Sequence, residues 1–174
     1  AELSKIDKRT DGDVEVIDNY LPKEQWQELN ELLTSGKFGW YFTDKITLEQ
    51  TDESDQFYFS HALYNQLSLH QSELFECCYP LLKLIEPKAL VRVKANLYIN
   101  QGKGVVEHTE HTDYPWPHKG ALYSINTCDG YTKFGEQKIE SVANRIIFFD
   151  PSKPHNSTSC SNAKFRCNIN FNYF

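Results

Sequence analysis

The stretch from Phe165 to Tyr173, which reads FRCNINFNY, decides the fold. Apolar and polar residues alternate along it without interruption, and this period of two is typical of a β-strand. One face carries Phe165, Cys167, Ile169, Phe171 and Tyr173, and the other carries Arg166, Asn168, Asn170 and Asn172. We expect the apolar face to pack outward against helices and the polar face to point into a wet interior.

A second alternating stretch, residues 89–99, has the same character. Its apolar face ends at Leu97 and Ile99, while Asn96 and Tyr98 lie on the other face. Two strands with polar inner faces indicate a polar cavity between them. The alternative for either strand is a sheet whose polar face simply meets solvent.

Short strands separated by turn signals dominate the second half of the chain. We expect them at residues 121–126, 131–134, 138–141 and 145–150, besides one near the start at 14–18. Glycine, proline and asparagine clusters lie between them, as expected for turns.

Two helices are expected in the first half. One opens at Leu21-Pro22, and the other covers residues 71–85, where Pro80 should kink or split it. This order of elements predicts an α+β, mainly β fold: a double-stranded β-helix (jelly roll) backed by N-terminal helices.

The chain has 174 residues, the length of one domain. We expect residues 1–88 to supply helical support and a lid, and residues 89–174 to form the jelly-roll core with the metal site. Residues 1–13 are expected to be loose, and residues 40–58 to form an extended excursion or lid.

Charge is distributed unevenly along the chain. The net charge is −6, and residues 1–55 carry 14 acidic but only 6 basic side chains. No basic stripe is present, which argues against nucleic acid as a partner. The acidic third favours a neutral or basic peptide, or a small molecule, as the substrate.

Membrane and redox signals point to a cytoplasmic protein. Mean hydropathy is −0.58 and no apolar run approaches the length of a membrane span. The five cysteines are odd in number and form no CxxC motif, so we interpret them as reduced thiols of a reducing compartment.

A metal-ligating pattern occurs at His111-Thr112-Asp113. Residues two apart on an extended segment point the same way, so this imidazole and carboxylate can share one metal. His155 follows a proline-rich turn and can supply a third ligand. Two histidines and one carboxylate form the facial triad of non-haem Fe(II) oxygenases. His108 and Glu110 form a competing HxE pair.

Arg166 lies on the predicted inner face, 11 residues after His155. A guanidinium in this position can bind a carboxylate with two parallel hydrogen bonds. The alternative role is a salt bridge to a structural acid. Tyr114 and Trp116, which directly follow the HxD pattern, either line a substrate groove or pack its rim.

With these residues, the sequence resembles the Fe(II)/2-oxoglutarate-dependent dioxygenase superfamily, especially the small prolyl-4-hydroxylase-like branch of bacteria and phages. The resemblance covers roughly residues 90–174. The segments that carry it are Asn96-Leu97-Tyr98, His111-Thr112-Asp113, residues 121–126 leading to 130–134, residues 144–150, Pro154-His155 and Arg166-Cys167-Asn168.

The resemblance implies roles for these residues. His111, Asp113 and His155 would bind Fe(II). Arg166, helped by Tyr98, would hold the distal carboxylate of 2-oxoglutarate, with Asn96 and Asn168 nearby. Collagen-type prolyl hydroxylases carry Lys where this chain has Arg166, and the link over residues 114–120 is short. Oxygen is the second co-substrate, and ascorbate is implied as a supporting reductant.

The expected reaction is hydroxylation of an unactivated C–H bond, first of all in a peptidyl proline, with release of succinate and CO2. A free small molecule as substrate and an AlkB-like nucleic-acid demethylase remain as alternatives. Outside this class stand a non-enzymatic jelly-roll module that binds a sugar or metal, and a zinc hydrolase with Glu110 as its base.

Overall fold

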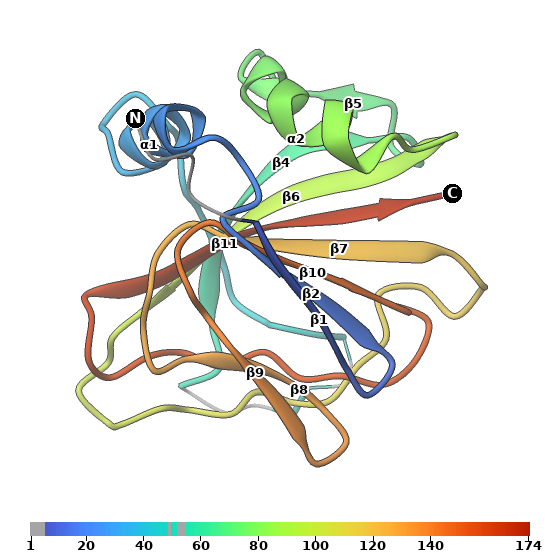
Figure 1. Cartoon of the computed structure of the whole chain (residues 1–174). Helices are drawn as coiled ribbons and strands as arrows, with labels where there is room; N and C mark the ends of the chain where they lie inside the picture. Colours follow the sequence, from blue (N-terminus) through green and yellow to red (C-terminus); the bar gives the residue numbers. More distant parts are fainter. Residues whose placement is uncertain (1–5, 49, 52–54) are drawn as a thin grey trace.

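Two β-sheets face each other, and the helices cover the outer side of the larger sheet (Figure 1). The computed structural model describes residues 6–48, 50–51 and 55–174. Every strand pairing in it is antiparallel. In spatial order the larger sheet consists of β1 (Asp7–Asp11), β2 (Val14–Asp18), β10 (Arg145–Phe149), β7 (Lys119–Ser124), β11 (Phe165–Tyr173), β6 (Leu90–Ile99), β4 (Tyr58–Asn65) and β3 (Tyr41–Thr43), with β5 (His70–Gln71) paired to β4.

The smaller sheet is built on the hairpin of β8 (Tyr131–Phe134) and β9 (Gln137–Glu140). Isolated bridges extend it: Lys133 pairs with Asn156, Glu107 with Thr158, and His111 with His155. Residues 107–111 and 155–158 therefore run beside the hairpin and complete the second layer. The predicted jelly roll is confirmed, and the metal-ligating pattern lies within its smaller sheet.

Three helical segments cover the larger sheet: α1 (Lys23–Leu33), the 3₁₀ helix η1 (Phe75–Cys78) and α2 (Tyr79–Ile85). Pro22 precedes the first turn of α1, and Pro80 lies in the first turn of α2, where a missing N–H costs nothing. The helix expected over 71–85 thus starts later and divides before Pro80. None of the described helices is long and apolar enough to cross a membrane.

The main core lies between the helices and the outer face of the larger sheet. Leu29 and Leu33 of α1 and Leu81 of α2 pack there with alternate residues of β6 and β11, including Val93, Ala95, Cys167, Ile169 and Phe171. A smaller apolar cluster fills part of the space between the sheets, formed by Val14, Val16, Leu122, Ile139 and Ile147. The rest of the space between the sheets holds a cavity lined mostly by polar residues, together with apolar ones such as Leu122 and Phe149.

Strands are more numerous in the first half of the chain than the sequence predicts. Residues 7–11, which were expected to be loose, form β1. Within residues 1–88, which were expected to supply helical support, the structure also contains β3, β4 and β5. The alternation of β4 is hidden because its register shifts between Ala62 and Tyr64. His61 lies on this strand.

Candidate metal centre

His111 and His155 lie opposite each other in the smaller sheet. Each backbone N–H donates to the other residue's carbonyl, at 3.0 and 2.9 Å. The backbone N–H of Asp113 donates to the carbonyl of Pro151 at 2.9 Å, which fixes the third residue beside them. Two segments far apart in sequence are thereby clamped together at their ligand positions.

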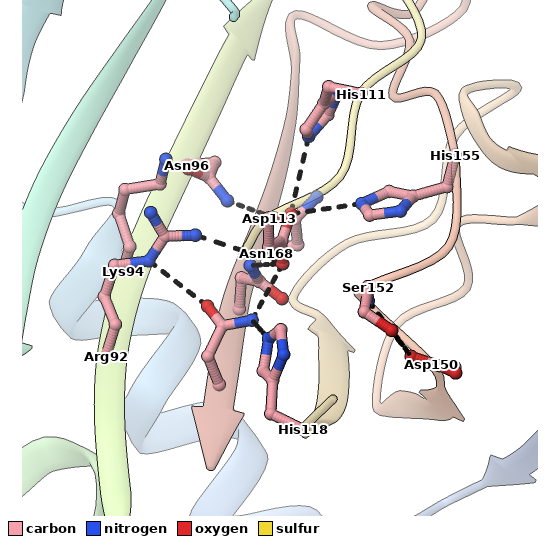
Figure 2. Close-up of polar contacts among 12 residues, drawn as sticks. Arg92, Lys94, Asn96, His111, Asp113, His118, Asp150, Ser152, His155 and Asn168 are labelled. Carbon is pink, nitrogen blue, oxygen red and sulfur yellow. Dashed lines mark hydrogen bonds and ion pairs between the residues drawn. The ribbon is translucent and has the colours of Figure 1, made fainter. Parts of the chain in front are cut away.

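The three side chains converge on one point (Figure 2). The Nε2 atoms of His111 and His155 lie 3.4 and 3.1 Å from Oδ1 of Asp113. All the candidate ligand atoms fall within 4.8 Å of one another. In the described part of the chain, this is the one group of three or more His, Cys, Asp or Glu side chains with metal-binding geometry.

Backbone carbonyls select the ring nitrogens that face the centre. Nδ1 of His155 lies 2.9 Å from the carbonyl of Lys153, and Nδ1 of His111 makes a longer contact of 3.4 Å with that of Thr109. Because a carbonyl can only accept, each Nδ1 carries the proton when a metal occupies Nε2. The Nε2 lone pairs are then available to a metal, an arrangement common around protein metal sites.

Two asparagines orient the carboxylate of Asp113. Its Oδ2 accepts hydrogen bonds from Nδ2 of Asn170 at 3.0 Å and from Nδ2 of Asn172 at 2.8 Å. Nδ2 of Asn172 also donates to Nε2 of His118 at 3.1 Å. Oδ1 is thus left for a metal. The alternation of β11 had placed both asparagines on the inner face, but nothing in the sequence assigned them this task.

In the metal-free triad, electrostatic interactions favour an ionised Asp113 beside a protonated His155. Burial works against the ionised form of Asp113, but hydrogen bonds from His111 and His155 and the charges of His155 and Arg92 outweigh it and hold its pKa well below the usual value. Burial likewise opposes the charge on His155, but the hydrogen bond and charge of Asp113 raise the pKa of His155 above its usual value.

A cavity of about 570 Å³ opens beside the triad. Tyr98, Asn96 and Asn168, the residues expected near a co-substrate, all line it. Nδ2 of Asn96 donates to Oδ1 of Asn168 at 2.9 Å. Burial, followed by the neighbouring Tyr58, raises the pKa of Tyr98 to about 12, so its phenol keeps its proton.

Arg166 lies directly behind this cavity wall and is almost completely buried, at 1% exposure. Its Nη2 donates to Oγ1 of Thr132, a cavity-lining residue, at 2.9 Å, and its Nη1 donates to the carbonyl of Thr158 at 3.1 Å. No ion pair to an acid is found for it among the described residues, so the salt-bridge alternative is not observed.

Gly130 leaves the space that Arg166 occupies. A Cβ at this position would lie 2.7 Å from Cδ of Arg166 and 2.5 Å from the carbonyl oxygen of Ser159. Any other residue would therefore displace the arginine or the backbone.

Unsatisfied polar atoms collect around the cavity. Among the described residues, the buried side-chain atoms without a hydrogen-bond partner are Oγ1 of Thr47, Oδ1 of Asn96, Nε2 of His108, Nε of Arg166 and Oδ1 of Asn170. Thr47, Asn96 and Asn170 line the cavity, and His108 and Arg166 lie against the ring of Tyr98. Buried polar groups are rarely left unpaired, so this cluster fits a site that binds a polar ligand.

The two aromatic residues after the triad occupy different positions. Tyr114 lines the cavity, whereas Trp116 is not among its lining residues and stacks on Tyr114 with ring centroids 4.8 Å apart. Part of the expected lid also reaches the cavity: residues 45–48 line it. Residues 49 and 52–54 of that interval lie outside the described residues.

The competing HxE pair does not reach the centre. His108 is buried, and its Nδ1 lies 2.8 Å from Oγ of Ser157. Burial, followed by the charges of Arg166 and His111, lowers the pKa of His108 to about 3, so the ring is neutral. Glu110 is exposed. Neither residue belongs to the metal-binding group found here.

Comparisons with known proteins show that the chain is similar to solved structures in its fold. No protein-family model matches the chain, and no curated protein matches it. A prolyl-4-hydroxylase from Pseudomonas putida superposes with a TM-score of 0.58 at 10% identity, covering 92% of both chains. A Trichoplax adhaerens prolyl hydroxylase, in complex with a peptide fragment of hypoxia inducible factor, gives 0.57 at 17% identity, covering 93% of this chain and 83% of that one.

A third similar structure is that of SnoN, an epimerase of nogalamycin biosynthesis, which contains Fe3+, alpha-ketoglutarate and nogalamycin RO. It superposes with a TM-score of 0.60 at 12% identity, covering 93% of this chain and 78% of that one. At sequence identities of 10%, 17% and 12%, these similarities establish the fold alone. The chain therefore has the fold of the 2-oxoglutarate- and Fe(II)-dependent oxygenases.

Proposed function

We propose that this protein is an Fe(II)- and 2-oxoglutarate-dependent dioxygenase that hydroxylates an unactivated C–H bond. The convergence of His111, Asp113 and His155 beside a polar cavity is the observation that carries the proposal. A facial triad leaves three positions on the metal for the co-substrate and oxygen. Asp113 fills the carboxylate position of that triad, which favours hydroxylation.

The residues present fit iron and its co-substrate. Nε2 of both histidines and Oδ1 of Asp113 would hold the metal, and the orphaned polar atoms of the cavity supply partners for an organic acid. Iron with 2-oxoglutarate and O2 supplies the oxidising power: one oxygen atom enters the substrate as hydroxyl, the other enters succinate, and CO2 leaves.

Arg166 is the candidate partner for the distal carboxylate of 2-oxoglutarate. It is a buried cation without an acidic partner among the described residues, and it borders the cavity behind Thr132. The protonated phenol of Tyr98 can donate a second hydrogen bond to the same group. Asn96 and Asn168 would line the remaining path to the metal.

For the substrate we propose a peptidyl proline as the first candidate. The fold is shared with two prolyl hydroxylases, one of them in complex with a peptide. Tyr114 and residues 45–48 would border such a substrate, with Trp116 supporting Tyr114 from behind. A free small molecule is the second candidate, because SnoN shares the fold and holds nogalamycin RO.

The five free thiols support a reducing, cytoplasmic location.

The test is turnover of 2-oxoglutarate by the Fe(II)-loaded protein in air. We expect succinate release that rises with proline-containing peptides, and a product heavier by one oxygen atom in mass spectrometry. Asp113→Ala should abolish both signals.

Other outcomes would assign other functions. Demethylation of methylated oligonucleotides, with inert peptides, would establish the AlkB-like alternative. Hydrolysis by the zinc-loaded protein without use of 2-oxoglutarate would establish the hydrolase. Sugar binding without any turnover would leave a binding module.

A further inference from the structure

The cavity carries more positive charge than its triad requires. Lys45, Arg92 and Lys94 line it, whereas Asp113 is the one acidic side chain that does so among the described residues. Asp113 directs Oδ1 to the histidines and Oδ2 to Asn170 and Asn172. Its charge is therefore committed to the metal centre.

The excess remains after the proposed cofactors are counted. Fe(II) and the dianion 2-oxoglutarate cancel each other, and Arg166 balances Asp113. The positive charges of Lys45, Arg92 and Lys94 are then in excess, although Arg92 lies near Asp113. Lys45 is exposed, whereas Arg92 and Lys94 are half-buried. Half-buried cations are costly unless they are paired, so these two residues favour an anionic guest in the cavity.

Arg92 and Lys94 are neighbours on the inner face of β6. Residues two apart on a strand point to the same side, and Figure 2 shows both rising from this strand beside the triad. Nε of Arg92 donates to Oδ1 of Asn172 at 3.2 Å, its Nη2 lies 3.9 Å from Oδ2 of Asp113, and its Cζ lies 5.1 Å from the ring centre of Tyr114. These contacts fix the guanidinium at the wall of the cavity.

Of the two residues, Lys94 provides the stronger evidence for an anion site. Its Nζ donates to the hydroxyl of Tyr58 at 2.9 Å, and it forms no ion pair with any acid in the described part of the chain. Burial and the charge of Arg92, partly offset by Asp113, lower the pKa of Lys94 to about 7. An anion bound here would restore the charged form.

We infer that Arg92 and Lys94 bind an anionic group of the primary substrate, a carboxylate or a phosphate, and so place the neighbouring carbon at the metal. The inference rests on the proposed function and names its substrate class. It revises the expectation from overall composition, because the acidic N-terminal third favours neutral or basic partners while the cavity itself is cationic. In a peptide, the group would be an acidic residue beside the target.

The test measures binding of two simple anions, methyl phosphate and propionate, to the protein saturated with Zn(II) and 2-oxoglutarate. Calorimetric titrations compare wild type with Lys94→Met, Arg92→Gln and Lys83→Gln. Lys83 is an exposed residue of α2, so its variant removes one positive charge outside the cavity. Metal content is measured for every variant, because Arg92 approaches Asp113.

We expect saturable binding of at least one anion to wild type, weakened about tenfold or more in Lys94→Met and Arg92→Gln, since hydrogen bonds to charged groups are typically worth this much. Lys83→Gln should match wild type, and 2-oxoglutarate affinity should stay unchanged in Lys94→Met. The preferred anion separates carboxylate from phosphate.

Three results would overturn the inference: no saturable binding of either anion to wild type, equal affinities in wild type and Lys94→Met, or loss of 2-oxoglutarate in Lys94→Met, which would move this lysine into the co-substrate site. Failure of wild type to bind 2-oxoglutarate at all would instead refute the proposed function.

Discussion

The two faces of the β6–β11 pair differ sharply although the same strands supply both. Outward-facing Val93, Ala95, Ile169 and Phe171 are fully buried in the core beneath the helices. The alternate residues of the same two strands point the other way and line or border the polar cavity: Arg92, Lys94, Asn96, Tyr98, Arg166, Asn168 and Asn170. One face supplies stability by burying apolar surface, and the other supplies binding groups held in fixed positions.

This separation explains how the protein can carry a cluster of buried polar groups. Unpaired polar atoms around the cavity cost stability, and the apolar face on the other side of the same sheet compensates for them. Changes to the inner face should therefore alter binding while the fold persists. Changes to the outer face should alter stability while the binding groups persist.

The largest effect on the inner face is expected from Asp113→Ala. Removing this proposed ligand, on which both histidine Nε2 atoms converge, should abolish stoichiometric Fe(II) binding and all turnover. The circular dichroism spectrum should remain that of the wild type because the main core lies on the other face. Retained stoichiometric iron would place the metal elsewhere, for example at His108 and Glu110.

On the outer face, Phe171→Ala should cost about 3–5 kcal/mol in free energy of unfolding, the usual range for a fully buried phenylalanine. Denaturant unfolding measures it. At temperatures where the variant is folded, its metal stoichiometry should equal that of the wild type. Loss of metal from a folded Phe171→Ala protein would show that the two faces are not independent.

A smaller effect is expected from Asn172→Ala, which removes one of the two amides that orient Asp113. Metal affinity should fall about 10- to 100-fold, the typical result of losing a hydrogen bond to a ligand. Asn100→Ala is the matched control, since its amide contacts only loop backbone. Equal metal affinity in both variants would remove the orienting role from Asn172.

The most subtle test uses pH. Asp113 raises the pKa of His155 in the metal-free protein above its usual value of ~6.5. A metal must displace that proton, so metal affinity should fall as the pH drops through the raised pKa.

Stability of the metal-free protein should change in the opposite direction over the same range. The stabilisation from charged His155 is present at low pH and is lost as the pH rises through the raised pKa. Metal titrations and thermal unfolding across that range measure the two trends. Metal affinity that does not change with pH there would contradict the assignment of His155 as a ligand.

Sequence patterns predicted the parts of this molecule that depend on local periodicity. The alternation of residues 165–173 predicted both faces of β11, and the spacing of His111, Asp113 and His155 predicted a metal-binding group. The strand β4 was missed because its bulge breaks the period of two.

Other features depend on which strands become neighbours. The bonds from Asn170 and Asn172 to Asp113 join β11 to a loop nearly 60 residues away, which no local pattern reveals. The alternation of residues 89–99 puts Arg92 and Lys94 on the same face as Asn96 and Tyr98, but nothing in the sequence assigned these two cations a binding role in the cavity.

Iron and 2-oxoglutarate are proposed to share this cavity, and the sharpest test is an anaerobic titration of the Fe(II)-loaded protein with 2-oxoglutarate. The wild type should develop the weak visible charge-transfer band of the chelate. In Arg166→Ala the affinity should fall by roughly one and a half to three and a half orders of magnitude, the ~2–5 kcal/mol cost of losing one partner of a buried charge pair, and Arg166→Lys should lose less. No band in the wild type, or an unchanged affinity in Arg166→Ala, would contradict the account.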